Sequence, residues 1–112
     1  MDITFRNEKL AKIFNSEKSL MREYGTENAK KIKHRMAVLA VATCLDEVPV
    51  HPPDRRHELS GDRKGQFAVD LKHPQRLIFE PNHNPLPRRT DGGLDLRKIS
   101  AITIVEVEDY HG

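Results

Sequence analysis

The placement of proline is the feature that most constrains how this chain folds. All seven prolines lie between residues 49 and 87. Proline lacks a backbone N–H donor and is excluded from helix interiors and central strands. Residues 45–54 hold three prolines and are therefore predicted to form a surface loop. Residues 81–100 hold three more and a Gly-Gly pair, which predicts a long loop with a helical turn at Asp95–Ile99. A loop of this length in a compact domain is often functional or mobile.

The segment before the prolines has helical periodicity. A short alternation at Ile3–Phe5 predicts a first strand, and Asn7 is a candidate N-cap for a helix that runs to about Asn15. The polar stretch 15–25 is predicted to end that helix and turn the chain. Thr26 is expected to cap a second, longer helix that runs to about Thr43. Its core-facing stripe is expected to consist of Ile32, Met36, Leu39, Ala40 and Thr43.

The segment after residue 54 is rich in strand patterns. Arg55–Leu59 and Gln66–Leu71 flank a Gly- and Asp-containing connection at 60–65, which predicts a hairpin with one buried and one wet face. Arg76–Glu80 is predicted to be the next strand. Ala101–Val107 is apolar on both faces and is expected to lie at the centre of the sheet.

This order of elements predicts a single α+β domain over residues 1–112. We expect two N-terminal helices packed on one face of a small, mostly antiparallel twisted sheet, with the other face left open. The net charge of +2 gives no argument for nucleic-acid binding, so the local distribution of charge has to carry it. A single cysteine, no apolar run near the roughly 20 residues of a spanning helix, and no signal layout predict a soluble, cytoplasmic protein.

The polar side chains of the β half are the candidates for chemistry. His57 shares a strand face with Arg55, and arginine binds phosphate oxygens in a bidentate manner. Arg76 is expected to project from the open face, where it would hold a phosphate group. Tyr110 and His111 lie directly before the last residue, Gly112, and both can transfer protons. The candidate catalytic residues are His57, Arg76, Asp109, Tyr110 and His111, and the candidate RNA-binding residues are Arg55, Arg56, Arg63 and Lys64.

Each candidate also has a purely structural interpretation. A lone strand histidine is usually a half-buried polar residue, a basic hairpin is usually a solvated one, and an exposed arginine can serve solubility alone. The histidines have neither the HExxH spacing nor the cysteine partners of metal sites, and no Gly-rich phosphate loop is present. We therefore expect neither a metal nor a cofactor.

Three segments together resemble a known family. HELSGDRKGQFAV at 57–69, RLIFE at 76–80 and the terminal VEDYH are similar to motifs of the HigB-like toxins of the RelE/ParE superfamily. The resemblance implies a RelE-like fold and a toxin of a type II toxin–antitoxin system, which cleaves mRNA on the ribosome. It also implies a helix-turn-helix antitoxin partner of the HigA type. The chain departs from the family pattern at Ser60, at Gln75 and in the long loop 81–100.

For such an enzyme we expect the 2′-oxygen of RNA to attack the adjacent phosphate without a metal. Among Tyr110, His57 and His111, one group would take the 2′-OH proton and another would protonate the leaving 5′-oxygen, and the sequence leaves this assignment open. Two rival functions are a non-nucleolytic, ParE-like toxin that acts on DNA gyrase and a protein-interaction module without catalysis.

Overall fold

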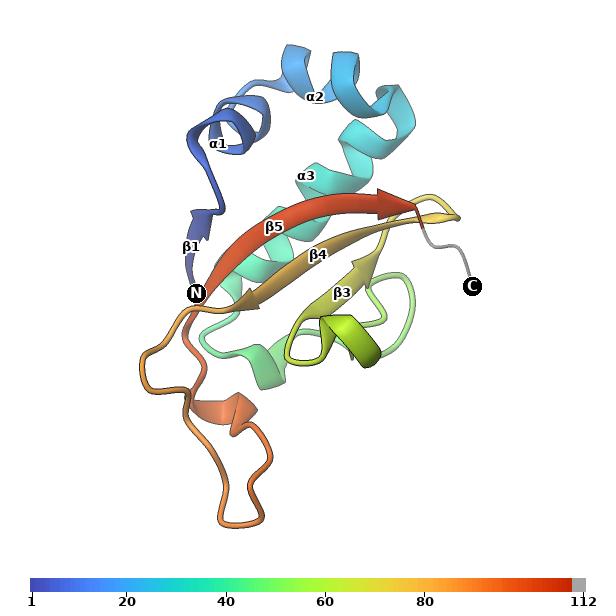
Figure 1. The fold of residues 1–112 in the computed structure, drawn as a ribbon. Helices are drawn as coiled ribbons and strands as arrows, with labels where there is room; N and C mark the ends of the chain where they lie inside the picture. Colours follow the sequence, from blue (N-terminus) through green and yellow to red (C-terminus); the bar gives the residue numbers. More distant parts are fainter. Residues whose placement is uncertain (110–112) are drawn as a thin grey trace.

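A five-stranded sheet forms the body of the computed structural model, which describes residues 1–109. Its strands are β1 (Asp2–Phe5), β2 (His57–Glu58), β3 (Phe67–Asp70), β4 (Gln75–Pro81) and β5 (Ala101–Asp109). They lie in the order β1-β5-β4-β3-β2, and only β1 and β5 run parallel. The expected antiparallel sheet and the inner position of the last strand are both confirmed (Figure 1).

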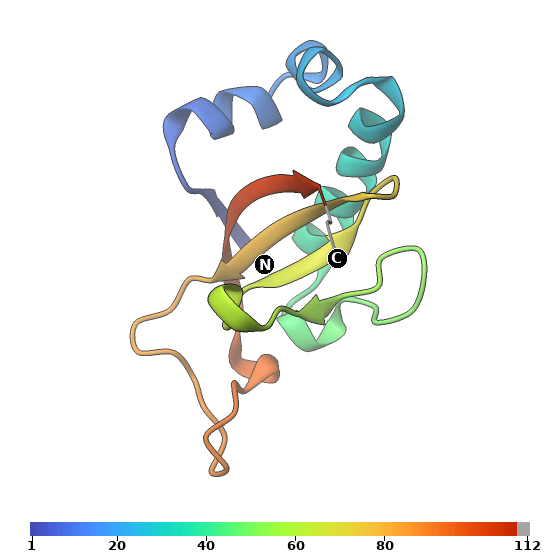
Figure 2. The same ribbon diagram turned by 45° about the vertical axis from the view of Figure 1, so that its right-hand side comes forward.

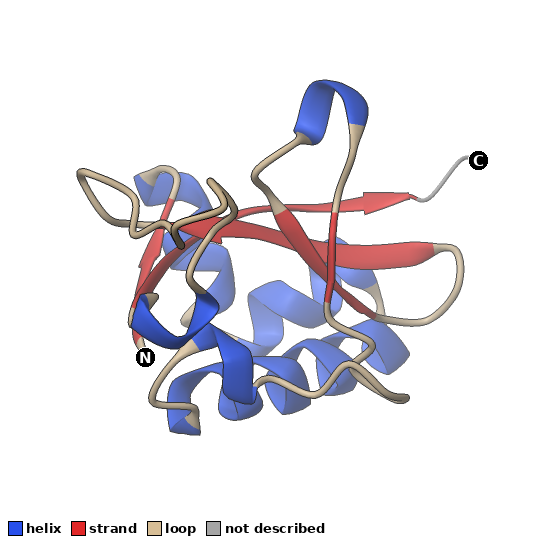
Figure 3. Ribbon diagram, turned by 90° about the horizontal axis from the view of Figure 1, so that it is seen from below, coloured by secondary structure: helices blue, strands red, loops and turns tan. Residues whose placement is uncertain are grey.

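Three helices, and not the expected two, cover one face of this sheet (Figure 3). They are α1 (Glu8–Phe14), α2 (Glu17–Tyr24) and α3 (Thr26–Val41). Asn7 caps α1 as expected, since its side chain accepts a hydrogen bond of 2.9 Å from the Leu10 N–H. The prediction of a turn over residues 15–25 is wrong, because Ser16 caps a second helix by accepting from the Ser19 N–H at 3.2 Å.

The main core lies between the helices and the sheet. Ile32 and Leu39 of α3 are fully buried there, as the stripe predicted. Ala40 and Thr43, which also belonged to the expected stripe, are exposed. The helix ends at Val41, and Ala42 takes the buried position three residues after Leu39. The sheet contributes Phe67, Leu77, Phe79, Ile102 and Ile104 to the same cluster.

The two proline-rich segments are loops, as expected. Residues 45–54 contain one short 3-10 turn, η1 (Leu45–Glu47). The longer loop between β4 and β5 projects away from the sheet (Figures 1 and 2), and it contains another 3-10 turn, η3 (Leu96–Lys98), at the predicted place. None of the described helices combines the length and the apolar character needed to cross a bilayer.

Candidate active site on the open face of the sheet

The sheet face opposite the helices is partly covered. A second apolar cluster of Leu59, Ala68, Ile78 and Val105 lies on it, and the turn η2 (Gly61–Arg63) stands over this side (Figure 3). Ala68 has no exposed surface, so the expectation that its face of β3 is wet is wrong. This buried apolar cluster packs on the open face of the sheet, and polar side chains surround it.

His57 and Arg76 lie together on this face. Both line a cavity of about 420 Å³, to which Arg55, Asp70, His73 and Gln75 also contribute. Both also line an adjoining hollow of about 230 Å³, next to Ser60 and Arg63. Two residues 19 positions apart in the sequence thus meet because β2, β3 and β4 are neighbours in the sheet.

The imidazole of His57 is held by the backbone two residues earlier. Its Nδ1 lies 2.7 Å from the carbonyl oxygen of Arg55. Because a carbonyl oxygen only accepts hydrogen bonds, Nδ1 is the nitrogen that donates. In the neutral ring the lone pair is then on Nε2. This is the form that can take a proton from a substrate hydroxyl.

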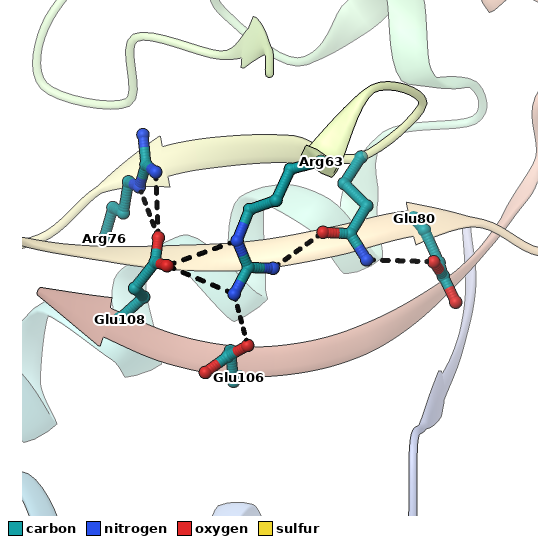
Figure 4. A network of polar contacts seen from close by, with 6 residues as sticks. Arg63, Arg76, Glu80, Glu106 and Glu108 are labelled. Atoms are coloured by element: carbon teal, nitrogen blue, oxygen red, sulfur yellow. Dashed lines mark hydrogen bonds and ion pairs between the residues drawn. The ribbon is translucent and has the colours of Figure 1, made fainter. Parts of the chain in front are cut away.

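Arg76 and Arg63 share the carboxylate of Glu108 on β5, and Arg63 also pairs with Glu106 (Figure 4). The Oε2 atom of Glu108 accepts from Nε and Nη2 of Arg76 at 3.1 and 2.8 Å. Its Oε1 atom accepts from Nε of Arg63 at 3.2 Å, and Glu106 accepts from the same guanidinium. The hydrogen bond with Glu106 raises the pKa of Arg63 further above its ordinary value. The network fixes two cations side by side at the edge of the hollow.

Opposing effects act on the pKa of Glu108. Burial would raise it, but the hydrogen bond from Arg76 and the charges of Arg63 and Arg76 outweigh burial and leave the pKa below its ordinary value. Glu108 is therefore an anion at neutral pH and a poor proton acceptor. Its geometry fits a residue that orients arginines.

Sequence reasoning missed both carboxylates because of a β-bulge. The register of β4 and β5 shifts between Ile78 and Phe79, so that Ile78 pairs with Glu106 and Phe79 with Ile104, and Val105 is the extra residue. Strict alternation would place Glu106 on the same face as Ile104, in the core. The bulge turns it to the open face. The nearest signal in the sequence was the repeated Glu at 106 and 108 in a mostly apolar strand.

The other candidates are placed as follows. Arg56 lines neither of the two His57 cavities; its Nε donates to the Val48 carbonyl at 2.9 Å, and burial lowers its pKa. Lys64 is exposed after η2. Asp109 lines a neighbouring hollow, which shares His73, Pro74 and Gln75 with the first cavity, and it does not line either His57 cavity itself. Tyr110 and His111 lie outside the described residues, so their catalytic role stays a prediction.

Comparison with known proteins finds similarity in structure alone. No protein-family model and no curated protein sequence matches the chain. A YoeB/ParE toxin from Agrobacterium tumefaciens superposes with a TM-score of 0.59 at 8% identity, over 99% of this chain and 100% of that one. A YoeB–YefM complex and a YoeB dimer, both from Staphylococcus aureus, superpose with a TM-score of 0.55 at 14% and 15% identity. Each of these two matches covers 100% of this chain and 98% of the other. At such identities the likeness is one of fold, and the chain has the fold of YoeB/ParE-type toxins.

Proposed function

We propose that this protein is the toxin of a type II toxin–antitoxin system and a ribosome-dependent mRNA endonuclease. The observation that carries the proposal is that His57 and Arg76 line the same cavity on the open face of a sheet with the YoeB/ParE-type fold. The sequence resemblance to HigB-like toxins names the same two residues independently of the fold.

The proposed reaction is a transesterification within the RNA. His57 Nε2 takes the proton of the 2′-OH, the 2′-oxygen attacks the adjacent phosphorus, and the bond to the 5′-oxygen breaks. The products are a 2′,3′-cyclic phosphate and a free 5′-OH, which receives its proton from Tyr110 or His111. Each positioned proton transfer is worth roughly 10²–10⁴ in rate.

Arg76 is proposed to stabilise the negative charge that builds on the phosphate. Glu108 holds one edge of its guanidinium, through Nε and Nη2, and so sets its orientation. Arg55 lines the cavity, Arg63 lines the adjoining hollow, and Lys64 is exposed after η2. These three cations are proposed to bind the RNA backbone, which makes binding dependent on salt. Asp109 is proposed to assist the terminal tyrosine and histidine. No step of this reaction requires a metal ion or a cofactor.

The proposed partners follow from the same assignment. A structural neighbour of this chain is a YoeB–YefM complex, in which a protein of the same fold is bound to a second protein. We propose that this chain likewise binds an antitoxin, of the helix-turn-helix HigA-like type. Its working place would be the cytoplasm, where ribosomes and mRNA are.

A cleavage assay on ribosomes programmed with a defined mRNA tests the proposal. We expect Arg76→Ala to lose roughly 10²–10³-fold in cleavage rate, as removal of one electrostatic donor does in other enzymes. His57→Gln should lose at least as much. Arg88→Ala is the matched control, because Arg88 is an exposed arginine on the long loop. Full cleavage by both site variants would overturn the assignment.

One observation favours the alternative of a non-nucleolytic toxin. Glu106 and Glu108 balance the charges of Arg63 and Arg76, so an RNA phosphate has to compete with carboxylates for both cations. A ParE-like toxin would inhibit DNA supercoiling by gyrase and leave ribosome-bound mRNA intact. Running both assays on the wild-type protein separates the two functions, and a protein inactive in both would be an interaction module.

A further inference from the structure

We propose that Asp70 is a positioning residue for His57 and that it acts through the side chain and backbone of Arg55. This inference rests on the proposed function, because it assigns His57 the role of proton acceptor. Asp70 belongs to β3 and Arg55 to the segment just before β2, and both line the cavity that holds His57. Neither residue needs to touch the reacting atoms for this role.

Arg55 has an unusual backbone. Its φ of 47° makes it the one non-glycine residue with positive φ among residues 1–109. Side chains with a Cβ are disfavoured there, and such conformations persist where surrounding contacts enforce them, often at functional sites. Two contacts do so at Arg55. Its N–H donates to the His51 carbonyl at 3.0 Å, and its Nε lies 2.8 Å from Oδ2 of Asp70.

Asp70 is itself firmly anchored to buried groups. Its N–H donates to the Asp54 carbonyl at 2.8 Å, and its carbonyl accepts from Nε of Arg35 at 2.6 Å. Arg35 and Asp54 are only 5% and 6% exposed, and their side chains lie 3.7 Å apart as an ion pair. These contacts fix the backbone of Asp70, from which its carboxylate reaches the Arg55 guanidinium.

The backbone conformation of Arg55 determines which nitrogen of the His57 imidazole carries the proton. The left-handed backbone at Arg55 presents its carbonyl to Nδ1 of His57 at 2.7 Å, which keeps the proton on Nδ1. If the ion pair with Asp70 is lost, Arg55 can relax to an ordinary extended conformation, and its carbonyl turns away from the ring. The neutral ring then divides between two tautomers, and only one of them has the lone pair on Nε2.

Nitrogen-15 NMR of the histidine rings tests this directly in the free, full-length protein. We would record spectra at a pH of about 8, where an ordinary imidazole with a pKa of about 6.5 is neutral. The His57 signals are those missing from the His57→Gln variant. We expect wild-type His57 to show a protonated Nδ1 and an unprotonated Nε2. In Asp70→Asn the chemical shifts of both nitrogens should move toward the average of the two neutral tautomers.

Asp91→Asn is the matched control. Asp91 also pairs with an arginine Nε, that of Arg89 at 3.3 Å, but on the exposed long loop. This variant should leave the His57 tautomer and the cleavage rate unchanged. Asp70→Asn should lower the maximal cleavage rate at least about tenfold, a part of the roughly 10²–10⁴ that a positioned base supplies. The mRNA concentration for half-maximal rate should change less than twofold.

A second variant guards against simple misfolding of Asp70→Asn. Arg55→Ala leaves Asp70 and its buried anchors in place and should loosen the tautomer in the same way. Wild-type nitrogen shifts in either folded variant would overturn the inference. If the wild-type protein cleaves no mRNA, the proposed function fails, and the NMR arm still decides whether Asp70 sets the tautomer.

Discussion

At the scale of single residues, Arg55 has a left-handed backbone conformation that favours glycine. The left-handed region costs a non-glycine residue roughly 1–2 kcal/mol. The ion pair with Asp70 opposes this cost, although the Arg55 side chain is about half exposed and solvent weakens the pair. A residue that is kept in an unfavourable conformation by a partner is expected to respond unusually to substitution.

We predict that Arg55→Gly is more stable than Arg55→Ala. Both changes remove the ion pair, but glycine adopts positive φ without strain and alanine does not. The difference in the free energy of unfolding should be about 1 kcal/mol in favour of glycine. Urea denaturation of the two variants measures it. At most positions outside turns, alanine is more stabilising than glycine. If the alanine variant were the more stable one here as well, the backbone of Arg55 would not be strained in solution.

At the scale of elements, the bulge in β5 decides which side chains reach the open face. A period of two along β4 predicts Leu77 and Phe79 on one face and Arg76 on the other, and the structure has both apolar residues in the core and Arg76 on the open face. The same period fails for β5, because the register depends on an extra residue that only the pairing with β4 reveals. His57 and Arg76 were therefore predictable from the sequence, whereas the carboxylates that hold Arg76 and Arg63 were not.

Helix α2 was missed for a related reason. Leu20 is its one buried residue, so its apolar stripe is too short to stand out from a polar turn. Its start is marked by Ser16, whose cap bond closes the first turn, and by Glu17 in that turn. Capping residues were the available signal, and the overall polarity of the segment concealed it.

The carboxylate of Glu108 joins β5, β4 and η2, and its depressed pKa makes a prediction about acid stability. A carboxyl group whose pKa is lower in the folded than in the unfolded protein stabilises the fold above the unfolded value, which is about 4.3 for glutamate. This stabilisation is lost as the pH falls through the lower, folded value. Glu108→Gln should therefore be less stable than the wild type at pH 7, by about 1 kcal/mol.

The difference between wild type and Glu108→Gln should shrink as the pH falls below about 4, the ordinary range for glutamate. Thermal unfolding of both proteins between neutral and acid pH measures this. Glu8→Gln provides the matched control, since Glu8 forms an exposed pair with Lys12 at the surface of α1. A difference that grows toward acid pH would contradict the direction assigned to the Glu108 pKa.

At the scale of the whole molecule, the candidate site and the long loop belong to opposite ends of the central strands. Gln75 and Arg76 begin β4 and Pro81 ends it, so the site and the loop are separated by roughly 17 Å of strand at about 3.4 Å per residue. The loop returns to the core through Ile99, which is fully buried, and its tip closes at the bridge between Arg88 and Leu94. Its proline and glycine content identified residues 81–100 as a loop. The path of the loop depends on the burial of Ile99 and on the Arg88–Leu94 bridge, which cannot be predicted from the sequence.

This separation predicts that the tip can be removed without damage to the site. Residues 89–93 lie beyond the bridge, and replacing them with Asn-Gly leaves a two-residue hairpin turn of a favoured type. The melting temperature should change by less than about 4 °C, which corresponds to less than about 1 kcal/mol for a domain of this size. If the protein has the proposed activity, the maximal rate of mRNA cleavage should stay within about twofold of wild type, because β4 separates the tip from His57 and Arg76. This is much less than the tenfold change that about 1.4 kcal/mol of barrier produces. The removed Arg89 is cationic, so an effect on ribosome binding would appear in the concentration for half-maximal rate.

A large fall in the maximal rate, in a variant that still melts like the wild type, would contradict this prediction. It would mean that the loop reaches the reacting RNA and that the site extends beyond the cavity around His57 and Arg76.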